Sequence, residues 1–202
     1  NVANLQKDAD GYYLIGSVQD WKDFATLVQT TPTANAKMTA DVNLGNDQTT
    51  IPTYQGTFDG QEHTLTVDLK STQHGYGPFL TLVGATIKNL HVAGYIYTSG
   101  QLAGSLMGDV RGNNTIRNCW SSVVLTAVKS GDGTHGGYAG VIREGTTNFT
   151  NCLFDGYMLG SGTNACGGFV GFTRTNDGAR LNFTNCLYKP SEQTIDAGSS
   201  AT

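Results

Sequence analysis

The sequence predicts an all-β protein, a right-handed, single-stranded parallel β-helix of about five coils with an N-terminal strand-helix cap. Three observations lead to this fold class. Two short landmarks recur along the chain in a fixed order, the composition suits short strands, and one amphipathic segment lies near the beginning of the chain. Together they indicate a solenoid, in which each unit packs mainly on its neighbours.

The first landmark ends in an Asn followed by Cys or Leu. It occupies residues 115–119, 148–152 and 182–186, with a looser copy at 86–90. The asparagines are separated by 29, 33 and 34 residues, and they are Asn89, Asn118, Asn151 and Asn185. Apolar, Gly-rich stretches lie between these copies, at 79–84, 102–106, 138–142 and 166–170. This recurrence predicts one structural unit per repeat.

The composition favours strands over helices in each unit. Only 14% of the 202 residues are charged, and the chain has 27 Gly and 4 Pro. Many Gly and β-branched residues that alternate at period two argue against a helical solenoid. We therefore expect three short strands per coil, for example 119–128, 137–142 and the segment that leads to Phe149. Equivalent residues should stack at about 4.8 Å per coil.

The repeat also predicts which side chains face the interior. Ile116 and Cys119 are expected to point inward, and Arg117 and Trp120 outward. Asn118 then lies at the bend, where Asn tolerates left-handed backbone geometry and its amide can bond the copies above and below. We expect the four asparagines to form an internal ladder with a structural role, which we favour over ligand binding.

The N-terminal segment predicts a cap. A strand is expected at 12–15, and Ser17 followed by Asp20 resembles a capping box. One helical face then carries large apolar side chains, which are Trp21, Phe24, Leu27 and Val28. An amphipathic helix across the open end of a β-helix covers unpaired backbone and exposed core.

We accordingly divide the chain into a cap at 1–35, coils at 36–189 and a polar tail or linker at 190–202. It begins at Asn1 without a signal segment, which suggests a piece of a longer precursor with neighbouring domains. A net charge of −4 with scattered cations disfavours nucleic acid as a partner. Insertion into a membrane is not expected, because no sufficiently long apolar run is present.

Several segments resemble one family. Phe58-Asp-Gly-Gln-Glu-His-Thr-Leu65 resembles the Phe-Asp-Gly-x-x-His-Thr-Ile segment found early in many bacterial surface β-helix domains. Gly168-Phe-Val-Gly171 resembles the GLUG motif, a Gly-hydrophobic-hydrophobic-Gly repeat. The helix around Trp21, followed by 38–44, is similar to the usual lead-in. The resemblance, to GLUG-motif β-helix domains of adhesin-like proteins, extends over residues 12–189. It has departures, since 138–144 lacks the closing Gly and 102–108 matches only approximately.

The resemblance implies an exported bacterial protein of host-associated species, located extracellularly or at the cell surface. Related domains occur in large adhesin-like proteins and beside peptidase domains. The family pattern contains no catalytic residues, so none is carried over. The expected function is a non-enzymatic surface module without a cofactor, which either binds a glycan or a host or cell-surface protein, or serves as a structural spacer.

One outward row is the candidate binding site. The position after each Asn-Cys or Asn-Leu holds an outward side chain, and these residues are His91, Trp120, Leu153 and Leu187. Stacking predicts an exposed row that suits sugar rings. The alternative is a structural row that the protein's own loops, or the stems of Arg117 and Lys189, cover.

The cysteines are expected to be free thiols. Cys119, Cys152 and Cys186 share one repeat position, where parallel Cβ vectors would strain a disulfide, and Cys166 lies elsewhere. We predict a ladder of buried thiols that act as small apolar residues. No Cys-x-x-Cys or paired His spacing indicates a metal site.

No catalytic residue is predicted. Asp59 and His63 come closest to an acid/base pair, but Asp-Gly turn bonding explains them better. The alternative function is a carbohydrate-active β-helix enzyme, either a polysaccharide lyase or a glycoside hydrolase, which needs converging carboxylates. Glu144 and Asp155 have no evident partner in the sequence. An ice-binding β-helix is rejected, because Thr64-Leu-Thr66 does not recur along a flat face.

Overall fold

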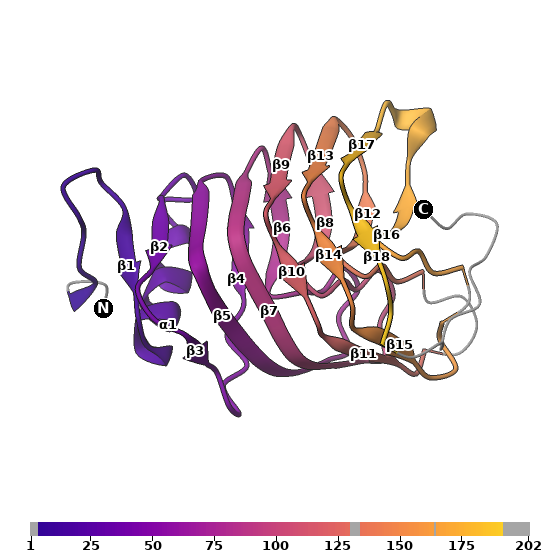
Figure 1. Ribbon diagram of the computed structural model, residues 1–202, viewed down its shortest axis with the longest axis horizontal. Coiled ribbons are helices and arrows are strands. Elements are labelled where there is room, and N and C mark those ends of the chain that lie inside the picture. Colours follow the sequence, from indigo (N-terminus) through magenta and orange to yellow (C-terminus); the bar gives the residue numbers. More distant parts are fainter. Residues whose placement is uncertain (1–3, 130–133, 164, 192–202) are drawn as a thin grey trace.

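The protein is an all-β solenoid of parallel strands with about four turns and very little helix (Figure 1). The computed structural model describes residues 4–129, 134–163 and 165–191. The predicted parallel β-helix is therefore confirmed. A fifth coil begins after residue 165, but it is only partly formed within the described chain.

The strands form two sheets, and all pairs of named strands are parallel. The 13-stranded sheet consists of β1 (Tyr13–Ile15), β2 (Ala36–Met38), β3 (Val42–Asn43), β5 (Thr57–Ser71), β7 (Thr86–Thr98), β9 (Asn114–Arg117), β10 (Trp120–Ser121), β11 (Val124–Ala127), β13 (Thr146–Thr150), β14 (Leu153–Phe154), β15 (Tyr157–Leu159), β17 (Arg180–Thr184) and β18 (Leu187–Tyr188). The five-stranded sheet consists of β4 (Ile51–Tyr54), β6 (Phe79–Val83), β8 (Met107–Arg111), β12 (Ala139–Ile142) and β16 (Val170–Thr173). Each coil contributes one strand to this smaller sheet.

Two early strands run continuously around a bend that later coils divide into shorter strands. β7 has 13 residues and pairs with β9, β10 and β11 of the following coil. The single strand expected at 119–128 is therefore wrong, because β10 and β11 are separate strands. The Ser121 hydroxyl accepts a hydrogen bond of 3.5 Å from the Val123 amide, and such local bonds compete with regular strand pairing.

The register of the second landmark differs from the expected one. Met107 pairs with Ala139, which pairs with Val170, so segment 138–142 lies opposite 106–110 and not opposite 102–106. The reason is close packing between coils: a Cβ atom on Gly137 would collide with the carbonyl of Gly168. In the true register, Gly137-Tyr-Ala-Gly140 stands opposite Gly168-Phe-Val-Gly171, so the closing Gly is present in this coil.

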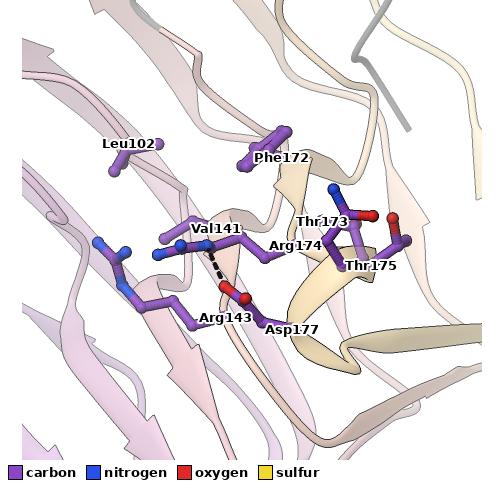
Figure 2. Close-up of a pocket in the computed structure, with 9 residues that line it drawn as sticks. Leu102, Val141, Arg143, Phe172, Thr173, Arg174, Thr175 and Asp177 are labelled. Atoms are coloured by element: carbon purple, nitrogen blue, oxygen red, sulfur yellow. Dashed lines mark ion pairs between the residues drawn. The ribbon is translucent and has the colours of Figure 1, made fainter.

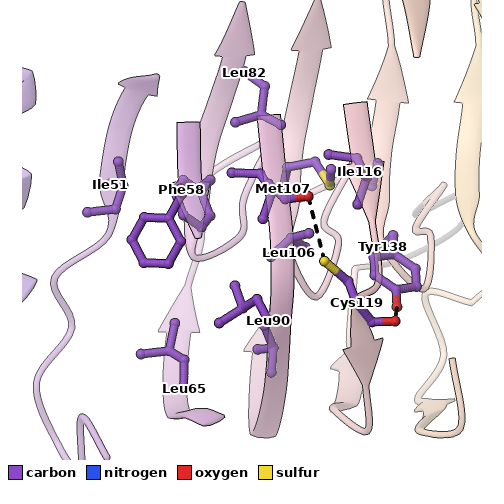
Figure 3. Close-up of a cluster of buried hydrophobic side chains, with 14 of the residues drawn as sticks. Ile51, Phe58, Leu65, Leu82, Leu90, Leu106, Met107, Ile116, Cys119 and Tyr138 are labelled. Carbon is purple, nitrogen blue, oxygen red and sulfur yellow. Dashed lines mark hydrogen bonds between the residues drawn. The ribbon is translucent and has the colours of Figure 1, made fainter. Parts of the chain in front are cut away.

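The core consists of columns of stacked side chains, part of which Figure 3 shows. One column joins equivalent inward positions of five successive coils, which are Phe58, Ile87, Ile116, Phe149 and Phe183. The first four are fully buried. Ile116 and Cys119 point inward while Arg117 and Trp120 are exposed, so the predicted alternation of faces is confirmed.

The asparagine ladder is present for three of the four predicted members, Asn89, Asn118 and Asn151, but at the surface. All four asparagines have positive φ, between 52° and 54°. Asn118 Nδ2 donates to Asn89 Oδ1, and Asn151 Nδ2 donates to Asn118 Oδ1, each at 3.2 Å. Asn89 Nδ2 in turn donates to Asp59 Oδ1 at 3.0 Å. The expectation of an internal ladder is wrong, because at this bend the amides lie on the outside of the coil, where Asn118 and Asn151 are exposed.

The N-terminal helix α1 (Val18–Val28) lies at one end of the solenoid (Figure 1). The Ser17 side chain accepts a hydrogen bond from the Asp20 amide at 3.1 Å, and Asp20 Oδ2 accepts one from the Gly16 amide at 2.9 Å. Trp21 is fully buried, and its ring packs edge-on against Phe58 at 6.0 Å and Phe79 at 5.9 Å. The helix therefore closes the core at this end.

Within the described residues, no disulfide bond joins the four cysteines, as expected. Cys119, Cys152 and Cys166 are buried, whereas Cys186 in the last coil is only partly buried. Burial raises the pKa of the Cys119 and Cys186 thiols.

Most of the predicted tail, residues 192–202, lies outside the described residues. Within the described part of the chain, no helix has the length and apolar character needed to cross a membrane.

Candidate functional site

The outward row predicted from the repeat is formed. His91 is in register with Trp120, Trp120 with Leu153, and Leu153 with Leu187. The four residues come from β7, β10, β14 and β18, which are neighbours in the larger sheet. Their stacking follows from parallel pairing without a register shift between these strands.

The Trp120 ring is held in place from two sides. It stacks on the His91 ring with 3.8 Å between centroids and 6° between planes. Its Nε1 donates to Asp155 Oδ1 at 2.7 Å. His91 is itself bonded on both ring nitrogens, to the Thr64 hydroxyl at 3.0 Å and the Ser122 hydroxyl at 2.8 Å. The indole is therefore preorganised in one orientation.

The row is accessible at two of its four positions. Trp120 is 43% exposed and Leu187 is 55% exposed, whereas His91 and Leu153 are partly buried. Loops of the described chain therefore do not cover the Trp120 ring. Burial lowers the pKa of His91, although the carboxylates of Asp155 and Asp41 oppose this effect. The imidazole is consequently neutral near pH 7.

Sequence reasoning missed the rest of this face. Tyr95 and Tyr97 follow His91 along β7 at alternating positions, and their exposed fractions are 62% and 45%. Parallel pairing aligns Tyr95 with Val124 and Tyr157, and Tyr97 with Thr126 and Leu159. We call the set of His91, Tyr95, Tyr97, Trp120, Tyr157 and Leu159 the outer aromatic face. The signal was available as Tyr-x-Tyr around the inward Ile96.

A small hollow of about 170 Å³ adjoins the Trp120 ring. It is lined by Glu62, Asn89, Leu90, His91, Asn118 and Trp120. The ladder asparagines thus form one wall of a depression beside the stacked rings. Their amides, exposed at the bend, are available to a ligand as well as to one another.

Asp59 and His63 do not form an acid/base pair. His63 Nδ1 lies 3.2 Å from Asp41 Oδ1, while Asp59 accepts hydrogen bonds from the Gln61 amide and the Asn89 side chain. The structural interpretation of Asp59 as a turn residue fits these contacts. Asp155, which seemed unpartnered in the sequence, accepts from Trp120. Within the described residues, no group of three or more His, Cys, Asp or Glu is arranged to hold a metal.

A second candidate site lies on the smaller sheet, where a pocket of about 640 Å³ opens beside β12 and β16 (Figure 2). Arg143, Arg174 and Asp177 provide charges, and Leu102, Val141 and Phe172 provide apolar walls. The sequence suggested only isolated arginines. Parallel register brings Arg143 and Arg174 together, because Arg143 directly follows β12 and Arg174 directly follows β16.

Comparison with known proteins informs the fold alone. No family model and no curated protein matches this chain. Its fold is similar to the crystal structure of a putative immunoglobulin A1 protease from Bacteroides ovatus, with a TM-score of 0.50 and 15% sequence identity. The match covers 97% of this chain and 82% of that chain. It supports the β-solenoid, and the GLUG resemblance stays a prediction from the sequence.

Proposed function

We propose that the protein is a non-enzymatic extracellular module that binds a glycan on its outer aromatic face. The observation that carries this proposal is the Trp120 ring, which is fixed by His91 and Asp155 and yet 43% exposed. A rigid aromatic ring packs on an apolar surface with little loss of conformational entropy. Sugar rings present such a surface on their C–H faces.

The shape of the face favours an extended saccharide. Equivalent side chains of neighbouring coils are about 4.8 Å apart, so the His91 and Trp120 rings form an open stack on the surface and not a closed pocket. Tyr95 and Tyr97 lie farther along β7, beyond the bend at which the following coil divides into β10 and β11, and they are exposed as well. Several sugar units of one chain could therefore contact the face at once, which suits a surface module better than a spacer.

The polar groups of this face support binding more than catalysis. Glycoside hydrolases generally use two carboxylates that flank one bond. Asp155, the carboxylate next to the Trp120 ring, already accepts the indole hydrogen bond. Two segments support a location of the protein at the cell surface, attached to neighbouring domains. Both Phe58 to Leu65 and Gly168 to Gly171 resemble segments of surface β-helix domains.

A glycan array probed with the full chain tests the proposal, followed by calorimetric titration of the best ligand. Trp120→Ala should weaken affinity at least about tenfold, because one buried aromatic contact contributes on the order of 1.4 kcal/mol or more. Phe183→Ala is the matched control, since Phe183 is 44% exposed but lies in another column. It should bind like the wild type.

Two results would count against this function. If no glycan binds, or if Trp120→Ala and Phe183→Ala lose affinity equally, the face is not the binding site. Incubation with pectin, alginate and glycosaminoglycans separates the alternative: released oligosaccharides would indicate a carbohydrate-active enzyme. An array of surface proteins run beside the glycans would detect a protein ligand instead.

A further inference from the structure

Three arginines form a column on the smaller sheet. Arg111, Arg143 and Arg174 occupy equivalent positions, because Val110 pairs with Ile142 and Ile142 with Thr173 just before them. Their stems are therefore about 4.8 Å apart from coil to coil. In a protein of net charge −4, this column concentrates positive charge at one place.

Each guanidinium is held through its Nε atom. Arg143 Nε lies 2.6 Å from Asp109 Oδ2, Arg174 Nε lies 2.7 Å from Asp177 Oδ2, and Arg111 Nε lies 3.4 Å from Asp109 Oδ1. Among the described residues, the terminal Nη groups of Arg143 and Arg174 have no acceptor at hydrogen-bond distance. The two carboxylates orient the arginines through Nε. The paired N–H donors of the terminal Nη groups are left for a further anion.

The pocket beside these donors also has an apolar side. Leu102, Val141 and Phe172 line it, and the Phe172 ring is 38% exposed (Figure 2). Asp109 and Asp177 balance two of the three cations, which leaves one positive charge in excess. A ligand that fits carries an oxyanion next to an apolar ring face.

We propose that this arginine pocket binds the carboxylate or sulfate group of an acidic sugar. The oxyanion accepts from the Nη groups of Arg143 and Arg174, and the sugar ring lies against Phe172. This site goes beyond the outer aromatic face and does not depend on it, because it lies on the other sheet.

The backbone of the pocket argues against a peptide ligand. Peptides are commonly bound by strand addition or by free backbone N–H groups that capture a terminal carboxylate. Here the Arg143 amide donates to the Val110 carbonyl at 2.8 Å, and the Arg174 amide donates to the Ile142 carbonyl at 2.9 Å. Recognition is thus left to the guanidinium groups and the Phe172 ring, which match a charged sugar.

Calorimetric titration of the full chain with four probes tests the proposal. The probes are a galacturonate hexasaccharide, a heparin hexasaccharide, neutral maltohexaose and a hexapeptide with a free C-terminal Phe. At least one acidic sugar should bind, and its affinity should fall with added salt. Arg143→Gln and Arg174→Gln should each weaken binding about tenfold or more, as expected for a lost charge-assisted hydrogen bond.

Arg117→Gln is the matched control, because Arg117 is exposed on β9 of the other sheet and the substitution removes the same charge. Its affinity should stay within about twofold of the wild type. If Arg143→Gln loosens the fold by leaving Asp109 less paired, Arg174→Gln still decides, since both Arg174 and Asp177 are largely exposed.

Selective binding of the galacturonate or of the heparin hexasaccharide tells a carboxylate ligand from a sulfate ligand and supports the site. Peptide binding alone, binding of no acidic probe, or an equal loss in Arg117→Gln overturns it.

Discussion

The two ends of the solenoid present the same core column in different ways. Phe58 at the N-terminal end is fully buried, and its ring packs against Trp21 and Phe24 of the cap helix. Phe183 occupies the same column in the last coil and is 44% exposed, although its ring stacks on Phe149 at 5.2 Å. The repeat thus fixes the column, whereas burial at its ends depends on what covers it.

The largest expected effect separates these two phenylalanines. Phe58→Ala should lower the free energy of unfolding by about 3–5 kcal/mol, because it opens a cavity below the cap helix. Phe183→Ala should cost less than half as much, since its ring is already partly hydrated. Urea unfolding followed by circular dichroism measures both. Equal shifts of the two midpoints would show that the cap helix contributes little to the burial of Phe58.

A smaller effect is expected in the asparagine ladder. Asn118 bonds to neighbours on both sides and has φ of 53°. Asn118→Ala should therefore cost about 1–2 kcal/mol, from left-handed strain and lost hydrogen bonds. Asn118→Gly relieves the strain and should cost less. The comparison with the last coil is sharpened by Asn185→Ala, which should cost less than Asn118→Ala because the described chain has no coil beyond Asn185. Identical losses for all three variants in thermal unfolding would contradict this account.

The smallest effect concerns pH and the outward row, in which Leu187 of the last coil is the most exposed member. The pKa of His91 is lowered mainly by burial, so its folded-state pKa lies below the unfolded value near 6.5. The associated stability is complete above the unfolded pKa and is lost as pH falls toward the folded pKa. Thermal unfolding between pH 7.5 and about pH 5 should show this loss. His91→Gln should remove part of the pH dependence, and an unchanged slope would rule out His91 as its source.

The sequence was sufficient for the columns because their members recur at nearly constant spacing. The positions of Asn89, Trp120 and Leu153, and the free thiol of Cys119, all follow from one parallel register. It was insufficient for features created between coils. The alignment of 138–142 was four residues off, since Gly140 resembles Gly104 in sequence and only backbone contact distinguishes them.

The two candidate sites show the same limit. Trp120 and His91 could be placed together because both follow the Asn landmark, but their stacking depends on hydrogen bonds to Thr64, Ser122 and Asp155 from other positions. The arginine pocket could not be predicted, because the register of β8, β12 and β16 was unknown. Exposure of Tyr95 and Tyr97 was missed for another reason, since no repeated motif marks that position and its signal is the local alternation around Ile96.

The most direct test of the proposed glycan-binding face uses the contrast between the two tryptophans. Trp21 is fully buried and Trp120 is 43% exposed, so Trp21→Phe leaves Trp120 as the single fluorescent indole. Acrylamide should quench Trp120 efficiently in the free protein. Adding the glycan selected on the array should shift the emission to the blue and protect Trp120 from quenching. Saturating glycan that leaves both properties unchanged would contradict a binding face centred on this ring.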